Sequence, residues 1–155
     1  MKLNNKQKAF LKDFFNLIGK KDIFILAGGA GSGKSFISLL LVHFLAISHP
    51  NLRVGVFRKT SINLKNSTIP SYKRILELTG TTRLVKMVSM TANYKNGSKI
   101  LFLGADTEKD PDCDNLKGLE LSCALFEEVN QLDERVFDVV RSRVGRWLPD
   151  CSTVC

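Results

Sequence analysis

The sequence predicts an α/β protein in which helices cover both faces of a largely parallel sheet. Short apolar runs of strand length alternate along the chain with longer stretches of helical periodicity. The short runs are almost continuously apolar, as expected for strands that are buried on both faces. An Asn-Gly pair, Asn96-Gly97, lies within an alternating stretch and predicts one β-hairpin in addition.

The first third of the chain predicts helix, strand, loop, helix and strand in that order. Residues 5–19 place apolar side chains along one helical stripe, with Gly19 as the expected stop. The run IFILA at 23–27 is too short for a helix and predicts a strand, which a glycine-rich loop follows. The long apolar stretch at 36–47 predicts a helix, and LRVGVFR at 52–58 predicts the next strand.

The remainder of the chain continues the alternation. A helix is expected around 69–80, the hairpin within 83–103, and a polar surface loop over 105–120. The apolar run at 121–126 predicts another strand, and a helix is expected over 133–146. Since no repeat or linker interrupts the pattern, residues 1–155 are predicted to form one domain.

Composition favours a soluble intracellular protein with a polyanionic partner. The chain has 155 residues, 44% of them hydrophobic, and a formal charge of +8 from 23 basic and 15 acidic side chains. No apolar run reaches the roughly 20 residues of a membrane-spanning helix, and the start is unlike a secretory signal, so no membrane partner is expected. The four cysteines lack metal-ligand or paired spacing, which favours reduced structural thiols.

The segment GGAGSGKS satisfies the spacing G-x-x-x-x-G-K-[ST] between a predicted strand and a predicted helix. Such a loop turns its backbone N–H groups toward phosphate oxygens, and the following helix directs its positive end at the same anion. We therefore expect a nucleoside triphosphate as ligand, with Lys34 at the β and γ phosphates and the Ser35 hydroxyl on Mg²⁺. The alternative is a glycine-rich turn that binds nothing. The expected nucleotide-binding loop comprises Gly28, Gly29, Ala30, Gly31, Ser32, Gly33, Lys34 and Ser35.

Two adjacent acids, Glu127 and Glu128, end the apolar run at 121–126. Neighbouring carboxylates repel each other and lose hydration when buried, so a positive partner is expected nearby. In P-loop enzymes such a strand delivers one acid to the magnesium ion, and a second acid polarises the attacking water. Glu127 is thus the expected metal ligand and Glu128 the catalytic base, with Mg²⁺ and Lys34 as the positive partner. The alternative is a surface pair at a helix start.

In their order, these segments resemble the large terminase subunit of tailed bacteriophages. The resemblance rests on KQKAF, GGAGSGKS, VFRKT with the downstream NST, DNLKGLELSCALFEEVNQ and RSRVGR. It implies a P-loop NTPase of the RecA-like, additional-strand class that hydrolyses ATP to drive double-stranded DNA into a procapsid. It also implies a homo-oligomer at a portal, a small terminase subunit as partner, and location in the host cytoplasm.

The resemblance extends to individual residues. It assigns Gln7 to adenine recognition, Lys34 and Ser35 to phosphate and metal, Glu127 to metal, and Glu128 to catalysis. A single glutamine on an amphipathic helix more often simply faces water.

Three arginines and the end of the chain leave alternatives open. Arg58 resembles an arginine near the nucleotide pocket or a coupling element, but the residues alone indicate only a cation at the carboxyl edge of the sheet. One of Arg141, Arg143 and Arg146 is a candidate arginine finger, for which we select Arg143, and the alternative is a solvated helix face.

The 155 residues include neither the coupling motif nor the nuclease domain that the resemblance implies farther along, so we expect a C-terminally truncated ATPase domain with an exposed sheet edge. Two other functions remain open: a different P-loop ATPase acting on nucleic acid, of helicase or repair type, and a nucleotide-binding module without turnover.

Overall fold

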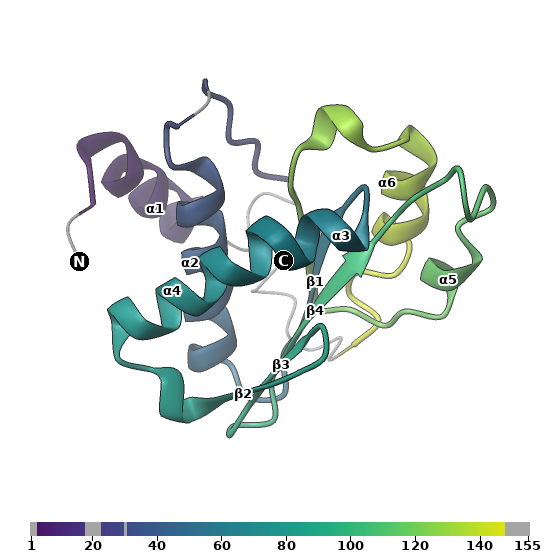
Figure 1. The fold of residues 1–155 in the computed structure, drawn as a ribbon. Helices are drawn as coiled ribbons and strands as arrows, with labels where there is room; N and C mark the ends of the chain where they lie inside the picture. The colour runs from purple at the N-terminus through teal and green to yellow at the C-terminus, as the bar shows by residue number, and fades with distance from the viewer. Residues whose placement is uncertain (1–2, 18–22, 30, 148–155) are drawn as a thin grey trace.

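The computed structural model describes residues 3–17, 23–29 and 31–147, and Figure 1 shows their arrangement. The helices and strands, in chain order, are α1 (Asn5–Leu17), α2 (Lys34–Ser48), β1 (Arg53–Arg58), α3 (Ser61–Asn63), a π-helical turn η1 (Leu64–Thr68), α4 (Ile69–Thr79), a 3₁₀ turn η2 (Thr82–Leu84), β2 (Val85–Val88), β3 (Thr91–Tyr94), β4 (Lys99–Gly104), α5 (Asp114–Lys117), β5 (Cys123–Phe126), a 3₁₀ turn η3 (Val129–Gln131) and α6 (Glu134–Arg141).

The strands of the described chain form one five-stranded sheet in the order β2-β3-β4-β1-β5. Strand β1 pairs in parallel with β4 and with β5, whereas β3 pairs antiparallel with β2 and with β4. The α/β class is confirmed, and the predicted parallel arrangement holds for β4, β1 and β5. The predicted hairpin is β3 and β4, with Gly97 at a φ of 87° in its turn, and β2 extends it to a three-stranded meander.

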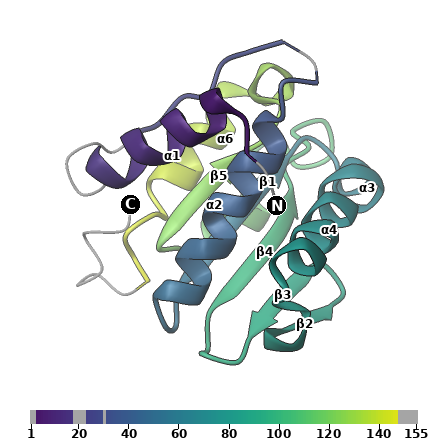
Figure 2. The same ribbon diagram turned by 90° about the vertical axis from the view of Figure 1, so that its left-hand side faces the viewer.

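Helices cover both faces of the sheet, as expected. Figures 1 and 2 show α1, α2 and α4 on one face and α5 and α6 on the other. Successive residues of β1 point to opposite faces, so Val56 packs in the core under α2 and α4 while Phe57 packs in the core under α5 and α6. Each parallel strand therefore has apolar side chains on both faces, which explains its continuous apolar sequence.

Helix boundaries follow from local backbone geometry. The cap residue of α2 at its amino end is Gly33, with a φ of 80°, and the cap residue of α4 at its carboxyl end is Gly80, with a φ of 68°. The Asn96 side chain donates hydrogen bonds to the carbonyls of Ala46 and Ile47 at 2.8 and 3.1 Å, which satisfies free acceptors in the last turn of α2. The hairpin turn thus also caps a helix.

The helix expected over 133–146 begins as expected, with Asp133 as its cap, but ends at Arg141. The Leu121 N–H donates to the carbonyl of Arg143 at 3.1 Å, and Val144 forms a parallel bridge with Leu121. Gly145, at a φ of 78°, then turns the chain. Pairing with the segment that leads into β5 therefore replaces the final helical turns.

The strand expected at 23–27 is absent from the structure, because residues 23–29 form no strand. Alternate side chains still face the core: Phe24 and Leu26 pack against it, whereas Ile25 is 86% exposed. The Phe24 ring lies 4.7 Å from that of Phe14 on α1, centroid to centroid. Side-chain packing rather than strand pairing therefore positions the segment that leads to the glycine-rich loop, and the pattern of apolar residues does not distinguish the two.

The loop predicted over 105–120 contains the short helix α5 and contributes to the second core. Cys113 and Leu116 are 2% and 3% exposed and pack with Val136 and Val140 of α6. Burial raises the pKa of the Cys113 thiol, so this cysteine behaves as a small apolar residue. Within the described residues, no helix combines the length and apolar character needed to cross a membrane.

Candidate nucleotide site

The glycine-rich loop and the acid pair lie at the same end of the molecule. Strands β1, β4 and β5 run in parallel, so their carboxyl ends share one edge of the sheet. Figures 1 and 2 both show the amino end of α2 at this edge, with the chain that leaves β5. In open α/β sheets, ligands bind outside the carboxyl ends of the strands.

The described residues of the glycine-rich loop, which we call the glycine cradle, include two glycines with left-handed backbone. Gly31 and Gly33 have φ values of 72° and 80°, which side chains with a Cβ rarely adopt. The Lys34 ammonium group donates to the carbonyl oxygens of Gly28 and Gly29, the latter at 2.8 Å. Ser35 is exposed in the first turn of α2, and Ala30 lies outside the described residues.

Gln7 lies against this loop. Its side-chain oxygen accepts from the N–H of Asn4 at 3.0 Å, while the Asn4 side chain accepts from the N–H of Gln7 at 2.8 Å, a reciprocal cap at the start of α1. The Gln7 amide nitrogen donates to the carbonyl of Gly33 at 3.5 Å. A Cβ on Gly33 would lie only 2.6 Å from that nitrogen. The candidate adenine-recognition residue is thus beside the cradle, where it also caps α1.

Glu127 is a buried acid at the end of β5. Its N–H donates to the carbonyl of Phe57 at 2.9 Å, which continues the pairing of β5 with β1 by one residue. Its side chain is 6% exposed, and its Oε2 accepts a hydrogen bond from the buried Thr68 hydroxyl. Its Oε1 is buried and has no hydrogen-bond partner among the described residues. This carboxylate oxygen is buried without a hydrogen-bond partner at the sheet edge where ligands bind. It is therefore suited to contact a ligand.

Glu128 has a different environment from its neighbour. Its φ of 53° places it in the left-handed region, which is uncommon for residues other than glycine and clusters at functional sites. Its side chain is 45% exposed, and its Oε1 lies 4.0 Å from Nη2 of Arg58. One acid is therefore buried and fixed, and the other is open to solvent.

Arg58 is the cation nearest the two acids among the described residues. Its guanidinium group is 15% exposed, faces Glu128, and donates to the hydroxyls of Ser67 and Thr68 at 3.0 and 3.4 Å. The sequence assigns Arg58 no such place beside Glu128. The predicted positive partner of the acid pair, Mg²⁺ together with Lys34, stays a prediction, and in this structure Lys34 bonds to its own loop. Strand pairing explains the position of Arg58: β1 lies beside β5, so its last residue meets the acids.

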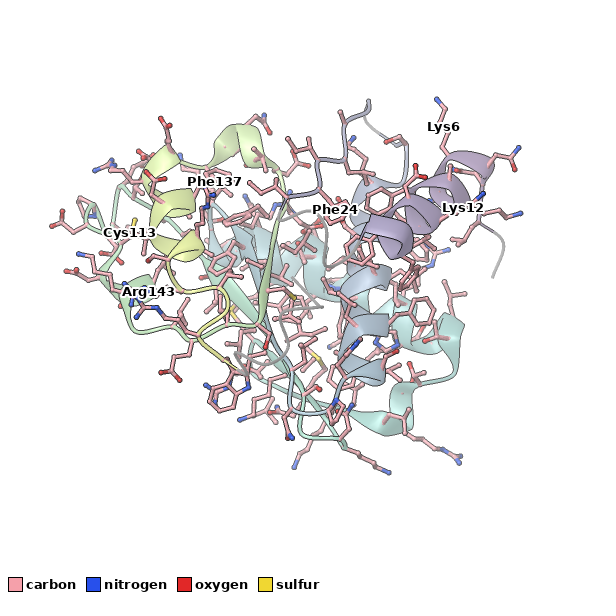
Figure 3. All side chains as sticks on the ribbon, turned by 180° about the vertical axis from the view of Figure 1, so that it is seen from behind. Lys6, Lys12, Phe24, Cys113, Phe137 and Arg143 are labelled. Carbon is pink, nitrogen blue, oxygen red and sulfur yellow. The ribbon has the colours of Figure 1, made fainter. Side chains whose placement is uncertain are left out.

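Arg143 is not brought to this site within its own chain. Its carbonyl bonds to Leu121, which precedes β5, whereas Glu127 follows β5. At about 3.3 Å per residue, the two ends of this segment are roughly 20 Å apart. Figure 3 shows Arg143 beyond the end of α6, at the opposite side of the view from α1.

The structure adds two site residues to which the sequence assigns no role, Ser67 and Thr68. Both lie at or beside the end of the π-helical turn that leads into α4. The signal available in the sequence is the polar run NST that follows the strand at 52–58. Nothing in its spacing indicates that both hydroxyls face Arg58 or that the Thr68 hydroxyl also faces Glu127.

The cradle at a helix amino end and the acid pair at the shared carboxyl edge are the features of a P-loop NTPase fold. The chain belongs to the phage terminase large subunit family, whose profile matches residues 20–150.

Among the similar solved structures are several of one protein, the large terminase of a thermophilic bacteriophage. One crystal form is 20% identical over 92% of this chain, with a TM-score of 0.73. The form in complex with ADP is 20% identical over 91% of this chain, with a TM-score of 0.72. A further structure of that protein is in complex with ATP-gamma-S. This chain covers 36% of the thermophilic phage protein, about a third of its length. No curated protein matches the sequence.

Proposed function

We propose that this chain is the ATP-binding, Mg²⁺-dependent ATP-hydrolysing motor domain of a phage terminase large subunit, which powers packaging of double-stranded DNA into a procapsid. The observation that carries the proposal is the position of the glycine cradle and the Glu127–Glu128 pair at one edge of the sheet. Membership of the terminase family and the nucleotide complexes of the thermophilic phage protein support it.

The proposed roles follow from the contacts of each side chain. Lys34 leaves its loop carbonyls for the β and γ phosphates, which are stronger acceptors for an ammonium group. Gln7 contacts the adenine beside Gly33. Arg58 keeps the exposed Glu128 oriented, and Glu128 accepts the proton of the attacking water.

The donor set fits a divalent cation that arrives with the nucleotide. Glu127 offers a buried oxygen without a protein partner, and Ser35 offers an exposed hydroxyl in the first turn of α2. Mg²⁺ is usually held by one or two protein oxygens together with phosphate oxygens and waters. When bound, it would neutralise charge that develops on the phosphates.

The proposed partners beyond ATP are double-stranded DNA, further copies of the chain at a portal, and a small terminase subunit, with the host cytoplasm as the location. Because Arg143 lies far from its own acid pair, its proposed role as an arginine finger is toward the nucleotide of a neighbouring copy.

The test combines nucleotide binding with single-turnover ATP hydrolysis in the presence of Mg²⁺. Lys34→Ala removes the main phosphate cation and should weaken ATP binding at least about tenfold, since a charged hydrogen bond contributes about 1.5–3 kcal/mol. Glu128→Gln should retain ATP but hydrolyse it about 100-fold more slowly or worse, because a general base contributes at least that factor. Lys12→Ala, at an exposed position on α1, is the matched control and should behave as wild type.

The outcomes separate the candidate functions. Unchanged ATP affinity in Lys34→Ala would contradict the cradle assignment. Normal hydrolysis by Glu128→Gln together with an inactive Glu127→Gln would exchange the roles of the two acids. Nucleotide binding by the wild-type chain without any single-turnover cleavage would support a nucleotide-binding module without turnover.

A further inference from the structure

We propose that Thr68 is a positioning residue for Glu127, supplied by the π-helical turn η1. The inference rests on the proposed function, because it assumes that Glu127 contacts the divalent ion of the bound nucleotide. Thr68 and Glu127 are 1% and 6% exposed, and the Thr68 hydroxyl donates to Oε2 of Glu127. A buried carboxylate depends strongly on such a bond, because water does not solvate it.

The direction of this hydrogen bond follows from the carboxylate. A carboxylate only accepts hydrogen bonds, so the single proton of the Thr68 hydroxyl points to Glu127. The guanidinium group of Arg58 has only donors, and it donates to the Thr68 oxygen at 3.4 Å. Arg58 thus acts on Glu127 through Thr68, while it faces Glu128 directly at 4.0 Å.

The bond also determines which oxygen of Glu127 is available to a ligand. With Oε2 held by Thr68, Oε1 is the buried atom without a protein partner among the described residues. Loss of the hydroxyl would free the carboxylate to rotate about its side-chain bonds toward Arg58, whose Nε is likewise buried without a partner there. Thr68 therefore keeps the acid in the orientation that leaves one oxygen free.

The π-helical turn is what places the hydroxyl there. The N–H of Ile69 bonds to the carbonyl of Leu64, five residues back, so one extra residue is accommodated between α3 and α4. Leu64, Thr68 and Ile69 are all buried as a result. Such turns are rare and frequently occur at functional sites. A regular α-helix would carry Thr68 and Ile69 in a different register relative to Leu64.

The test measures binding of Mn²⁺, as a stand-in for Mg²⁺, to the chain in the presence of ADP, by titration calorimetry or electron paramagnetic resonance. Thr68→Val removes the hydroxyl at nearly constant shape and should weaken Mn²⁺ binding about tenfold or more, as expected when the partner of a metal ligand is lost. Thr68→Ser keeps the hydroxyl and should restore nearly wild-type affinity. Binding of ADP without the metal should be unchanged in both variants.

The matched control is Thr79→Val. Thr79 lies on the same continuous helical segment, and its hydroxyl donates to the Ile75 carbonyl at 2.7 Å, far from the acids. Its loss should leave Mn²⁺ affinity unchanged, which separates positioning of Glu127 from general weakening of the helix. If Thr68→Val does not fold, Thr68→Ala makes the same test without the β-branch.

A double-mutant cycle identifies the residue through which Thr68 acts. In a Glu127→Gln background, Thr68→Val should weaken Mn²⁺ binding much less than in the wild type, because the group that it orients has already been changed. Wild-type Mn²⁺ affinity in Thr68→Val would overturn the positioning role of Thr68, and so would full additivity of the two changes. Neither result would affect the proposed function. Failure of the wild-type chain to bind ADP would instead overturn the proposed function on which the inference rests.

Discussion

A second group of buried polar side chains, apart from Glu127 and Thr68, forms a hydrogen-bonded network around His43. The His43 side chain is fully buried, and its Nδ1 lies 2.7 Å from the Tyr94 hydroxyl. Its Nε2 lies 2.9 Å from the Thr81 hydroxyl. Tyr94 also contacts the hydroxyl of Tyr72, and burial raises the pKa of both tyrosines. The network therefore contains neutral groups that join α2, α4 and β3.

Protonation of His43 should destabilise the fold. Burial lowers the pKa of His43 from 6.5 to about 4, so the unfolded chain binds the proton more readily than the folded chain. Stability should therefore be greatest above pH 6.5 and should fall as the pH decreases toward 4, by at most about 3 kcal/mol. Urea unfolding at about pH 7.5 and about pH 5 should show a loss of about 2 kcal/mol from this group.

The control for this prediction is His43→Gln, which keeps a polar side chain but cannot titrate. It should be less stable than wild type at neutral pH, because the network is disturbed, but should lose about 2 kcal/mol less between the two pH values. An equal loss in both proteins would mean that other groups cause the pH dependence.

Strand β1 packs so closely against its neighbours that one of its positions has no room for a side chain. Gly55 lies in the middle of β1, where an added Cβ would lie 2.5 Å from the Phe57 ring and 3.0 Å from the Leu121 side chain. The element that carries Arg58 to the site is thus tightly packed against the second core.

Gly55→Ala should destabilise the protein by about 1–3 kcal/mol, the usual cost of overpacking a core. The matched control is Gly118→Ala, where no atom lies within 4 Å of an added Cβ and the φ is −84°. That change should be neutral or stabilising by up to about 1 kcal/mol, because alanine restricts the unfolded chain. Chemical denaturation of the two variants checks the prediction, and equal stabilities would contradict it.

Across the whole molecule, the net charge of +8 favours association with a polyanion, and double-stranded DNA is the proposed partner. We expect binding that is weak, independent of DNA sequence, and sensitive to salt. With about three phosphate contacts, affinity should fall about 40-fold when salt rises from about 50 to about 200 mM. Filter binding with two unrelated duplexes at both salt concentrations is the measurement. Absence of binding at the lower salt would remove DNA as a direct partner of this domain.

Local patterns predicted much of this fold. A long apolar stretch identified α2, helical periodicity identified α4, and Gly80 marked the end of α4. The Asn96-Gly97 pair identified the β3–β4 hairpin. Each depends on residues near one another in the chain, where periodicity and turn chemistry act directly. The segment at 23–27 shows the limit, because its apolar residues are held by packing on α1 rather than by strand pairing.

The sequence by itself determined the α/β class, the glycine loop of the candidate site and the need for a positive group near Glu127 and Glu128. Only the tertiary structure decided which residues meet there. Arg58 and Thr68 reach the acids because β1 pairs with β5 and because a π-helical turn shifts the register before α4. Arg143 is separated from them because its backbone pairs beside Leu121, before β5. Contacts of this kind depend on which strands are neighbours in the sheet, and that is decided by packing between distant segments of the chain rather than by local periodicity.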